Sequence, residues 1–144
     1  MIATTSGSIV QLPGRAPLAF IIDDDRTIRV LISMVLGRLG IDCALFDGAT
    51  PALAALAGRR PQIAFLDIAL ANSDAVDVLK GMSAVRYDGI VQLVSGANPM
   101  ILETVQRIGV RHGLRLAPPL YKPFRGSALQ RIVAPLLGGV PAIT

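Results

Sequence analysis

The sequence predicts an α/β fold with a doubly wound, five-stranded parallel sheet and helices on both faces. Short, continuous apolar runs alternate along the chain with segments whose apolar residues recur at helical spacing. Two of the runs, "LAFII" (18–22) and "IAFLD" (63–67), show no alternation of polar and apolar residues, which is typical of strands buried on both faces. Strands that alternate with helices form parallel sheets through right-handed crossovers. At 144 residues, the chain fits one ordinary domain.

The strands are predicted from these apolar runs. In chain order, they cover 18–22, 41–46, 63–67, 89–96 and a short segment near Leu120 within "APPLYKPF". The first and third strands end at aspartates, the fourth at a serine and the fifth at a lysine. The polar groups that follow the strands are therefore expected at one edge of the sheet, where the carboxyl ends of parallel strands meet.

The helices are predicted from apolar spacing and from capping residues. In chain order, they cover 26–39, 50–57, 75–82, 98–111 and 127–137. Gly40 ends the first helix, because glycine readily adopts the left-handed conformation that follows a helix. Thr50 with Pro51, and Asn98 with Pro99, have the order of an N-cap and a first-turn proline. Ser127 is interpreted as the N-cap of the last helix.

The flanking segments differ in composition from the predicted domain, which covers 17–137. Residues 1–16 are rich in Thr, Ser, Gly and Pro without periodicity, which indicates a flexible N-terminal tail. Residues 138–144 are interpreted as a C-terminal tail or the start of a linker. No run approaches the ~20 apolar residues that span a bilayer, and the N-terminus lacks the pattern of a secretory signal. We therefore expect a soluble, cytoplasmic protein.

Charge and cysteine content narrow the classes of function. The net charge is +4 and most acids lie between Asp23 and Asp77, while the later chain is rich in arginine: Arg107, Arg111, Arg115, Arg125 and Arg131. Aromatic residues make up only 4% of the chain, so side chains that stack on bases are scarce. A solvated or protein-docking face is favoured over a nucleic-acid or acidic-lipid surface. The single cysteine, Cys43, is interpreted as a buried core residue, and with one histidine no zinc site can be assembled.

The strand ends bring together groups suited to phosphoryl transfer. Asp23 and Asp24 follow the first strand, and Asp67 ends the third. Their carboxylates repel one another unless a hard cation lies between them, and oxygen ligands of this kind suit Mg²⁺. Ser95 can donate a hydrogen bond to a phosphoryl oxygen, and Lys122 can balance its charge. A carboxylate nucleophile, a metal ion, a hydroxyl and a lysine form a plausible phosphoryl-transfer site.

The order of the motifs "IIDDD", "FLDIAL", "LVSGA" and "YKPF" resembles the receiver domain of bacterial two-component response regulators, over about 17–137. The resemblance implies a flavodoxin-like (CheY-like) strand order, 2-1-3-4-5. It also implies the site roles. Mg²⁺ would be held by Asp23, Asp24, Asp67 and the backbone carbonyl of Ala69. Asp67 would accept the phosphoryl group, Ser95 and Lys122 would contact it, and the Lys122–Pro123 peptide would be cis.

The resemblance further implies the partners. The phosphoryl donor would be a sensor histidine kinase or a histidine phosphotransfer protein. Phosphorylation would switch the face built from the fourth helix, the fifth strand and the fifth helix, which would bind a downstream protein or a second copy. In this interpretation the domain assists its own phosphorylation and dephosphorylation and is not an enzyme for a separate substrate.

The chain departs from the family pattern at three places. "ALANSDA" has Leu70-Ala71 and Asp74-Ala75 where the family often has Met-Pro and Asp-Gly. Pro119 replaces the aromatic residue that usually lies three positions before the lysine and rotates inward on phosphorylation. Tyr121 is either its substitute or an ordinary packed tyrosine. A proline cannot make the rotation of the usual switch, whereas the residues for the phosphorylation chemistry are retained.

Several alternatives remain open on the sequence. The chain could be the N-terminal part of a longer regulator, and "GLRLAPPLYKPF" resembles receivers that precede cyclic-di-GMP phosphodiesterase domains. It could instead be a small aspartyl-phosphate phosphatase with Asp23 as nucleophile and Asp25 as the second acid. A flavodoxin-like cofactor binder is disfavoured, because three acids after the first strand repel a phosphate. A receiver that works without phosphate is disfavoured because Asp67, Ser95 and Lys122 are all present.

Overall fold

The predicted α/β architecture is confirmed in the computed structural model of the protein, which describes residues 16–70, 75–96 and 98–138. A parallel sheet with strand order β2-β1-β3-β4-β5 forms the centre, and a further short strand, β6, also pairs with β4. The strands are β1 (Leu18–Ile22), β2 (Asp42–Phe46), β3 (Ile63–Asp67), β4 (Ile90–Ser95), β5 (Arg115–Leu116) and β6 (Leu120–Tyr121). The order 2-1-3-4-5 is as expected, but the fifth strand is split in two.

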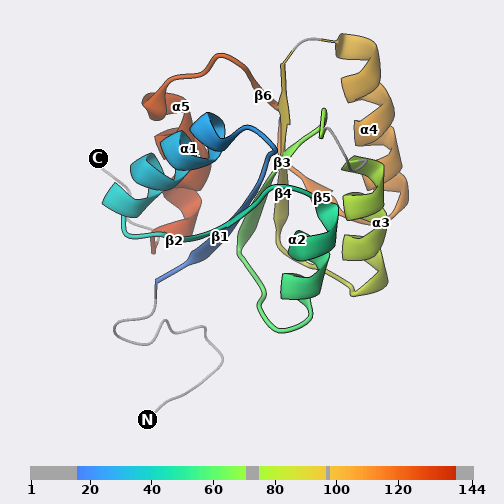
Figure 1. Ribbon diagram of the computed structural model, residues 1–144, viewed down its shortest axis with the longest axis horizontal. Helices are drawn as coiled ribbons and strands as arrows, with labels where there is room; N and C mark the ends of the chain where they lie inside the picture. The colour runs from blue at the N-terminus through green and yellow to red at the C-terminus, as the bar shows by residue number, and fades with distance from the viewer. Residues whose placement is uncertain (1–15, 71–74, 97, 139–144) are drawn as a thin grey trace.

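Helices cover both faces of the sheet (Figure 1). On one face α1 packs against α5, and on the other α3 lies between α2 and α4. The helices are α1 (Arg26–Arg38), α2 (Ala49–Leu56), α3 (Ala75–Ala84), α4 (Pro99–Arg111) and α5 (Gly126–Val133), which continues into a 3₁₀ turn at Ala134–Leu136. In the described part of the chain, no helix is long and apolar enough to cross a membrane.

Two apolar layers, one on each face of the sheet, hold these elements together. Phe20 and Leu66 belong to the layer beneath α2, α3 and α4, whereas Ile21 and Phe65 belong to the layer beneath α1 and α5. Neighbouring strand residues point to opposite faces, so a strand that is covered on both sides must be apolar at every position. This explains why β1 and β3 read as continuous apolar runs in the sequence.

The predicted N-caps of two helices are each wrong by two residues. The N-cap of α2 is Gly48 rather than Thr50, and the N-cap of α5 is Arg125 rather than Ser127. Neither residue makes a side-chain capping hydrogen bond, so the capping pattern that guided the prediction is not used. In contrast, the predicted cap of α4 is confirmed, since Asn98 Oδ1 accepts hydrogen bonds from the backbone N–H groups of Met100 and Ile101.

The predicted end of the last helix is also wrong. The α-helix ends at Val133 instead of Leu137, and a 3₁₀ turn follows it. Pro135 provides the physical reason, because proline lacks a backbone N–H and its ring clashes with the carbonyl four residues earlier. The tails expected at 1–16 and 138–144 lie almost entirely outside the described residues, as does the segment 71–74 of the departing loop.

Three helices end in the same left-handed turn, which requires an unusual backbone conformation. The residues with positive φ are Gly40 after α1 (φ 86°), Arg86 after α3 (φ 56°) and Gly113 after α4 (φ 78°). After α3, the N–H of Tyr87 donates to the carbonyl of Met82, which closes the turn. Glycine adopts this conformation without steric cost, but arginine does not. Gly40 ends α1 as predicted, and Arg86 introduces local backbone strain.

Arg86→Gly is expected to raise the free energy of unfolding by about 1 kcal/mol. A non-glycine residue in this region costs about 1–3 kcal/mol, partly offset because glycine increases the entropy of the unfolded chain. Urea unfolding measures the difference. As a matched control, Gly113→Ala at the equivalent position of α4 is expected to lower stability. An unchanged or lower stability in Arg86→Gly would mean that contacts of the arginine side chain outweigh its strain.

Cys43 differs from its predicted environment. It lies on β2, an edge strand of the sheet, and is only half-buried, although it packs against the apolar layer under α1 and α5. Burial, and secondarily the nearby Asp42 carboxylate, raises the pKa of the Cys43 thiol to about 11. The thiol is therefore protonated at neutral pH, which makes it a poor nucleophile and a structural residue.

Candidate functional site

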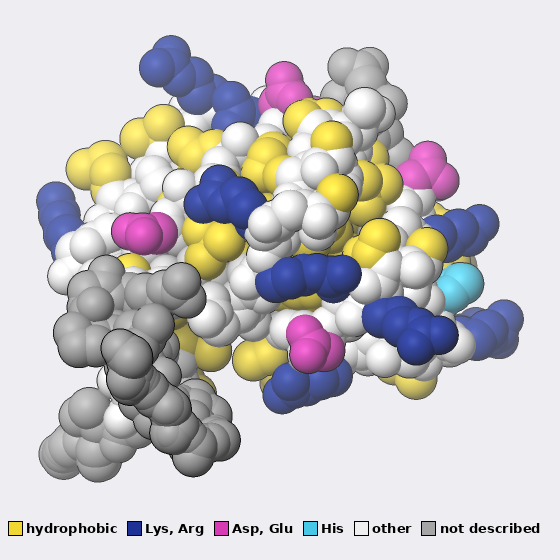
Figure 2. All heavy atoms as spheres, turned by 90° about the horizontal axis from the view of Figure 1, so that it is seen from below, with side chains coloured by type: hydrophobic (Ala, Val, Ile, Leu, Met, Phe, Trp, Pro, Cys, Tyr) yellow, Lys and Arg dark blue, Asp and Glu magenta, His cyan; other side chains and the backbone are white. Residues whose placement is uncertain are grey.

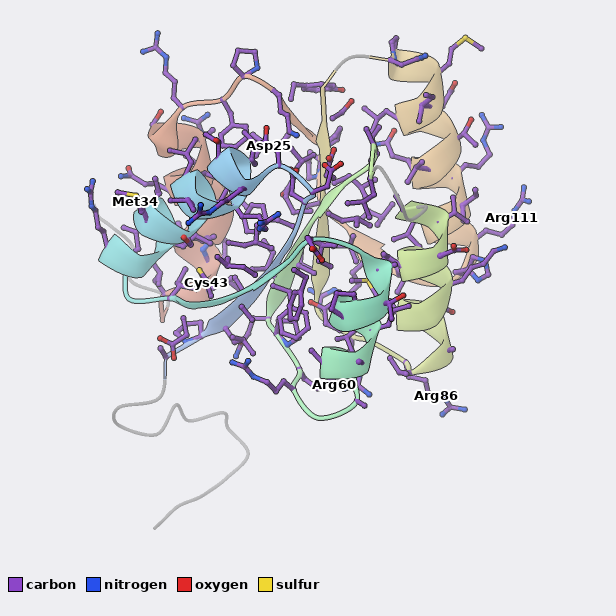
Figure 3. The ribbon with its side chains drawn as sticks, viewed as in Figure 1. Asp25, Met34, Cys43, Arg60, Arg86 and Arg111 are labelled. Carbon is purple, nitrogen blue, oxygen red and sulfur yellow. The ribbon has the colours of Figure 1, made fainter. Side chains whose placement is uncertain are left out.

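The predicted site residues meet at one edge of the sheet. Asp23 and Asp24 lie in the turn between β1 and α1, and Asp67 and Ser95 are the last residues of β3 and β4. Lys122 directly follows β6. In Figure 3, the label of Asp25 at the start of α1 shows where this edge lies, and Arg60 and Arg86 are labelled at the opposite end of the sheet. Strand order brings the five side chains together although up to 99 residues separate them.

Three carboxylates form the centre of this site. One oxygen from each of Asp23, Asp24 and Asp67 lies within 4.8 Å of the others. Asp23 and Asp67 are almost fully buried, with exposed fractions of 2% and 4%, whereas Asp24 is exposed. The cluster is therefore closed on the side of the sheet and open to solvent on the side of Asp24.

The charge of Asp23 is disfavoured in this environment. Burial raises the pKa of the Asp23 carboxyl, and the nearby Asp67 carboxylate raises it further. A hydrogen bond from the Asp25 N–H to Asp23 Oδ1 (2.8 Å) and the ammonium of Lys122 oppose this shift without cancelling it. Two buried carboxylates thus share one lysine, which leaves negative charge that a cation can neutralise.

Lys122 is the counterion of both buried carboxylates. Its Nζ lies 3.2 Å from Asp23 Oδ2 and 3.7 Å from Asp67 Oδ1. Lys122 is followed by a cis peptide bond to Pro123, as the resemblance implied. The backbone N–H of Lys122 donates to the carbonyl of Ser95 (2.8 Å), which joins the lysine to the end of β4.

The two oxygens of Asp67 have different surroundings. Oδ1 accepts a hydrogen bond from the Ala69 N–H (3.2 Å) and faces Lys122. The hydrogen bond from Ala69 and the contact with Lys122 thus both fall on the same oxygen, Oδ1. A carboxylate held at one oxygen presents the other to an electrophile or a metal ion. The backbone of Ala69 is close to the cluster, but the role predicted for its carbonyl remains a prediction.

Ser95 contributes a buried hydroxyl without a partner. Its exposed fraction is 1%, and its Oγ makes no hydrogen bond within the described part of the chain. Buried polar atoms are almost always hydrogen-bonded, and the exceptions mark sites where a ligand or water completes the arrangement. The hydroxyl is thus available to a group that binds at the carboxylate cluster.

Two further residues support the site, although the resemblance to receiver domains implied no role for them. Asp25 is the N-cap of α1, since its side chain accepts from the N–H of Thr27 (2.8 Å). Arg29, one turn into the helix, donates to the backbone carbonyl of Asp23 (2.7 Å). The third aspartate therefore fixes the start of α1 instead of joining the cluster. An acid directly before a helical pattern is the signal that identifies such a cap.

Tyr121, which is either a substitute for the missing aromatic residue or an ordinary packed tyrosine on the sequence, is largely exposed in this structure. It lies beside Ser95 in the register of β4 and β6, but 59% of its surface is exposed. The interpretation as an ordinary packed tyrosine is therefore wrong: β6 lies at the sheet edge, so this side chain faces solvent. Its role as a substitute switch remains untested.

The donor set fits Mg²⁺. The three clustered side chains offer only carboxylate oxygens, and the exposed position of Asp24 leaves room for water ligands, which Mg²⁺ retains in proteins. An open parallel sheet with an acidic cation site, a buried hydroxyl and a lysine at the carboxyl ends of its strands defines a domain equipped to accept a phosphoryl group.

The chain belongs to the family of response regulator receiver domains, whose model matches residues 19–133. Among curated proteins, it is 32% identical over 93 residues to the C4-dicarboxylate transport transcriptional regulatory protein DctD of Rhizobium meliloti, which covers 63% of this chain and 20% of that protein. It is 29% identical over 111 residues to the DNA-binding response regulator MtrA of Mycobacterium tuberculosis, covering 76% and 45%. The chain thus spans less than half the length of these relatives.

Solved structures agree with this assignment. The receiver domain of NtrX from Brucella abortus superposes with a TM-score of 0.70 at 26% identity and covers 84% of this chain and 98% of that one. A CheY-like receiver domain protein from Methanospirillum hungatei has a TM-score of 0.74 at 19% identity over 85% of this chain and 94% of that one. The second likeness concerns the fold alone.

Proposed function

We propose that this domain accepts a phosphoryl group on Asp67 from a sensor histidine kinase or a histidine phosphotransfer protein. The observation that carries the proposal is the convergence of Asp67 with Lys122 and the unpartnered hydroxyl of Ser95 beside the acidic cluster. Phosphoryl transfer needs a positioned nucleophile and cationic or hydrogen-bonding groups on the transferred oxygens. Each of these needs is met by a different strand end.

Each residue of the site has a separate role in the transfer. Asp67 Oδ2 attacks phosphorus, the phosphorus–nitrogen bond of the donor phosphohistidine breaks, and the imidazole leaves with the bonding electron pair and takes up a proton. Asp23, Asp24 and Asp67, with the Ala69 carbonyl, would hold Mg²⁺, which supplies charge neutralisation for the phosphoryl oxygens. Lys122 moves its ion pair from the carboxylates to the phosphoryl group, and Ser95 Oγ, which has no partner among the described residues, donates a hydrogen bond to a phosphoryl oxygen.

The response would pass from the site to the α4, β5–β6 and α5 face. Ser95 ends β4 and the helix α4 begins only a few residues later at Pro99, so a shift of the serine moves the start of that helix. The arginines of the later chain lie on these elements: Arg107 and Arg111 on α4, Arg115 on β5, Arg125 before α5 and Arg131 on α5. Of these, Arg107 pairs with the neighbouring Glu103. A downstream protein or a second copy is the partner that we assign to this face.

Basic side chains are not confined to the face formed by α4, β5, β6 and α5. Figure 2 shows the molecule from the end opposite to the site, where Lys and Arg side chains are also spread widely. At this end Arg60 and Arg115 donate to the backbone carbonyls of Val85 and Asp88. Part of the arginine excess therefore serves the fold, and we do not assign a nucleic-acid surface to it.

We infer that the domain acts within cytoplasmic signalling and assists its own phosphorylation, without turning over a separate substrate. The names of the matched relatives describe transcriptional regulators and DNA-binding response regulators that are much longer than the matched segment. A longer regulator, with an output such as a cyclic-di-GMP phosphodiesterase, is consistent with this proposal, because receiver chemistry is independent of the output that follows it.

Incubation with acetyl phosphate and Mg²⁺ tests the proposed function. The intact mass is expected to rise by one phosphoryl group, about 80 Da, and to return to the starting value on further incubation because an acyl phosphate hydrolyses. EDTA is expected to prevent the increase, since the carboxylates then repel the incoming phosphoryl group. Absence of the adduct both from acetyl phosphate and from a panel of histidine kinases would refute the proposal.

A further inference from the structure

The segment that runs from β5 to β6 along the edge of the sheet contains one residue more than the stretch of β4 that it faces. The register pairs Val91 with Leu116 and, further along, Val94 with Leu120. Two residues of β4 therefore face the three residues 117–119, which is the definition of a β-bulge. The bulge separates β6, which is the strand predicted near Leu120, from β5 (Arg115–Leu116), which was not predicted from the sequence.

The bulge is poor in backbone hydrogen-bond donors. Two of its three residues, Pro118 and Pro119, have no N–H and cannot extend the ladder to β4. On the side of α5, a cavity of about 340 Å³ adjoins these prolines and is lined by Ala128, Arg131 and others. The remaining residue, Ala117, donates its N–H to the carbonyl of Val91 (3.0 Å), so the ladder to β4 continues up to Ala117 and is interrupted at the two prolines.

Gln92 supplies the missing hydrogen bonds. Its side chain is fully buried in the middle of an otherwise apolar stretch of β4. Its Nε2 donates to the carbonyl of Pro118 (2.8 Å), within the bulge, and to the carbonyl of Leu93 (3.3 Å), on its own strand. Its Oε1 has no partner among the described residues. A buried amide that is only half satisfied is unfavourable compared with an apolar residue, which suggests a role other than core stability.

The bulge determines where Lys122 lies. Beyond it, Tyr121 pairs with Ser95, and the Lys122 N–H bonds to the Ser95 carbonyl. If the register of β5 continued without the extra residue, Leu120 would face Ser95 instead. Lys122 would then move by about 3.3 Å along the strand direction, and its side chain would point to the opposite face. Its contacts of 3.2 and 3.7 Å with Asp23 and Asp67 would be lost.

We propose that Gln92 is a positioning residue for Lys122: its amide anchors the proline bulge and thereby sets the register that carries the lysine to the carboxylates. Gln92 itself touches no group of the site. The consequence for phosphoryl transfer rests on the proposed function, whereas the consequence for the position of Lys122 does not.

Hydrogen exchange of Gln92→Leu tests the structural part. The Lys122 amide, which bonds to Ser95, is expected to exchange faster than in the wild type, while amides of β1 and β3 keep their protection. Val91→Ala is the matched control, because it removes buried volume from the layer under α2, α3 and α4 and leaves the Val91 carbonyl in place to accept from the Ala117 N–H of the bulge. Unchanged exchange at Lys122 in Gln92→Leu, or an equal acceleration in Val91→Ala at equal stability, would overturn the proposal.

Kinetics of phosphorylation by acetyl phosphate test the functional part. Gln92→Leu is expected to slow the reaction by at least about tenfold, because misplacing a reacting group by 1 Å can cost about 100-fold. In a Lys122→Met background, the same substitution is expected to have no further effect. A further fall in that background would show that Gln92 does not act through Lys122.

A compensating deletion provides a rescue. When Pro118 is removed from Gln92→Leu, the two residues Ala117 and Pro119 face two residues of β4, so no bulge is needed. The N–H groups of Leu120 and Lys122 can then bond to the same β4 carbonyls as before. Pro119 lies at a position of the ladder that needs no donor toward β4. Both exchange protection and phosphorylation rate are expected to recover, and failure of both to recover would count against the register argument. If the wild type is not phosphorylated at all, the proposed function fails, and the exchange measurements still decide the role of Gln92.

Discussion

Asp67→Asn is expected to abolish the phosphoryl adduct completely. The asparagine amide has the shape of the carboxylate but is not a nucleophile, so no acyl phosphate can form at this position. Its Oδ1 can still accept from the Ala69 N–H, which in the wild type is 3.2 Å away, so the loop after β3 keeps its hydrogen bond. Intact mass after incubation with acetyl phosphate and Mg²⁺ measures the effect, and the wild type is expected to gain about 80 Da.

Asp25→Asn is the matched control for this experiment. Asp25 follows the same strand end, yet it caps α1 and is not one of the three clustered acids. Asparagine is an equally good N-cap, so the helix start and the adduct are both expected to persist. An adduct that remains in Asp67→Asn and disappears in Asp23→Asn would instead identify Asp23 as the nucleophile. That result would favour the small aspartyl-phosphate phosphatase over the receiver mechanism.

Asp23→Asn is expected to stabilise the protein in the absence of Mg²⁺ and to remove its stabilisation by Mg²⁺. The raised pKa of Asp23 means that the folded state disfavours the charged carboxylate, chiefly because it is buried and also because Asp67 is near. A neutral amide removes this cost while its carbonyl can still accept from the Asp25 N–H. For the wild type, Mg²⁺ at ten times its dissociation constant is expected to add about 1.4 kcal/mol.

The raised pKa of Asp23 also predicts how the free energy of unfolding depends on pH in the absence of Mg²⁺. A carboxyl whose pKa is higher in the folded than in the unfolded state binds more protons in the folded state between the two values. Its contribution to stability is therefore greatest below the unfolded pKa, about 3.9, and is lost as the pH rises through the folded value. Asp23→Asn is expected to remove this component.

Urea unfolding at several pH values, with Mg²⁺ and with EDTA, measures both effects. If Asp23→Asn were less stable than the wild type in EDTA at neutral pH, the ion pair with Lys122 (3.2 Å) would outweigh burial and repulsion. If Mg²⁺ stabilised the variant as strongly as the wild type, the cation would bind elsewhere. The first result would contradict the expected cost of the Asp23 charge, and the second would contradict the interpretation of the acidic cluster as a cation site.

The class of fold and the identity of the clustered groups follow from the amino-acid sequence alone. Runs such as "LAFII" and "IAFLD" specify strands buried on both faces, because every position of such a strand must be apolar. In a parallel sheet the groups that end the strands meet at one edge, so Asp23, Asp67 and Ser95 could be brought together without coordinates. Periodicity and the succession of strands and helices along the chain are properties that a single sequence carries, whereas the strand order 2-1-3-4-5 was implied by the family resemblance.

The tertiary structure decided how these groups are held. The pairing of Lys122 with Asp23 joins residues 99 positions apart and depends on the register of the sheet edge. That register depends on the bulge at 117–119, in which Gln92 bonds to the carbonyl of Pro118. The prolines signal an irregular strand, but a glutamine in an apolar strand has no local pattern that reveals its partner. Long-range hydrogen bonds of this kind are set by packing and register, which local sequence does not encode.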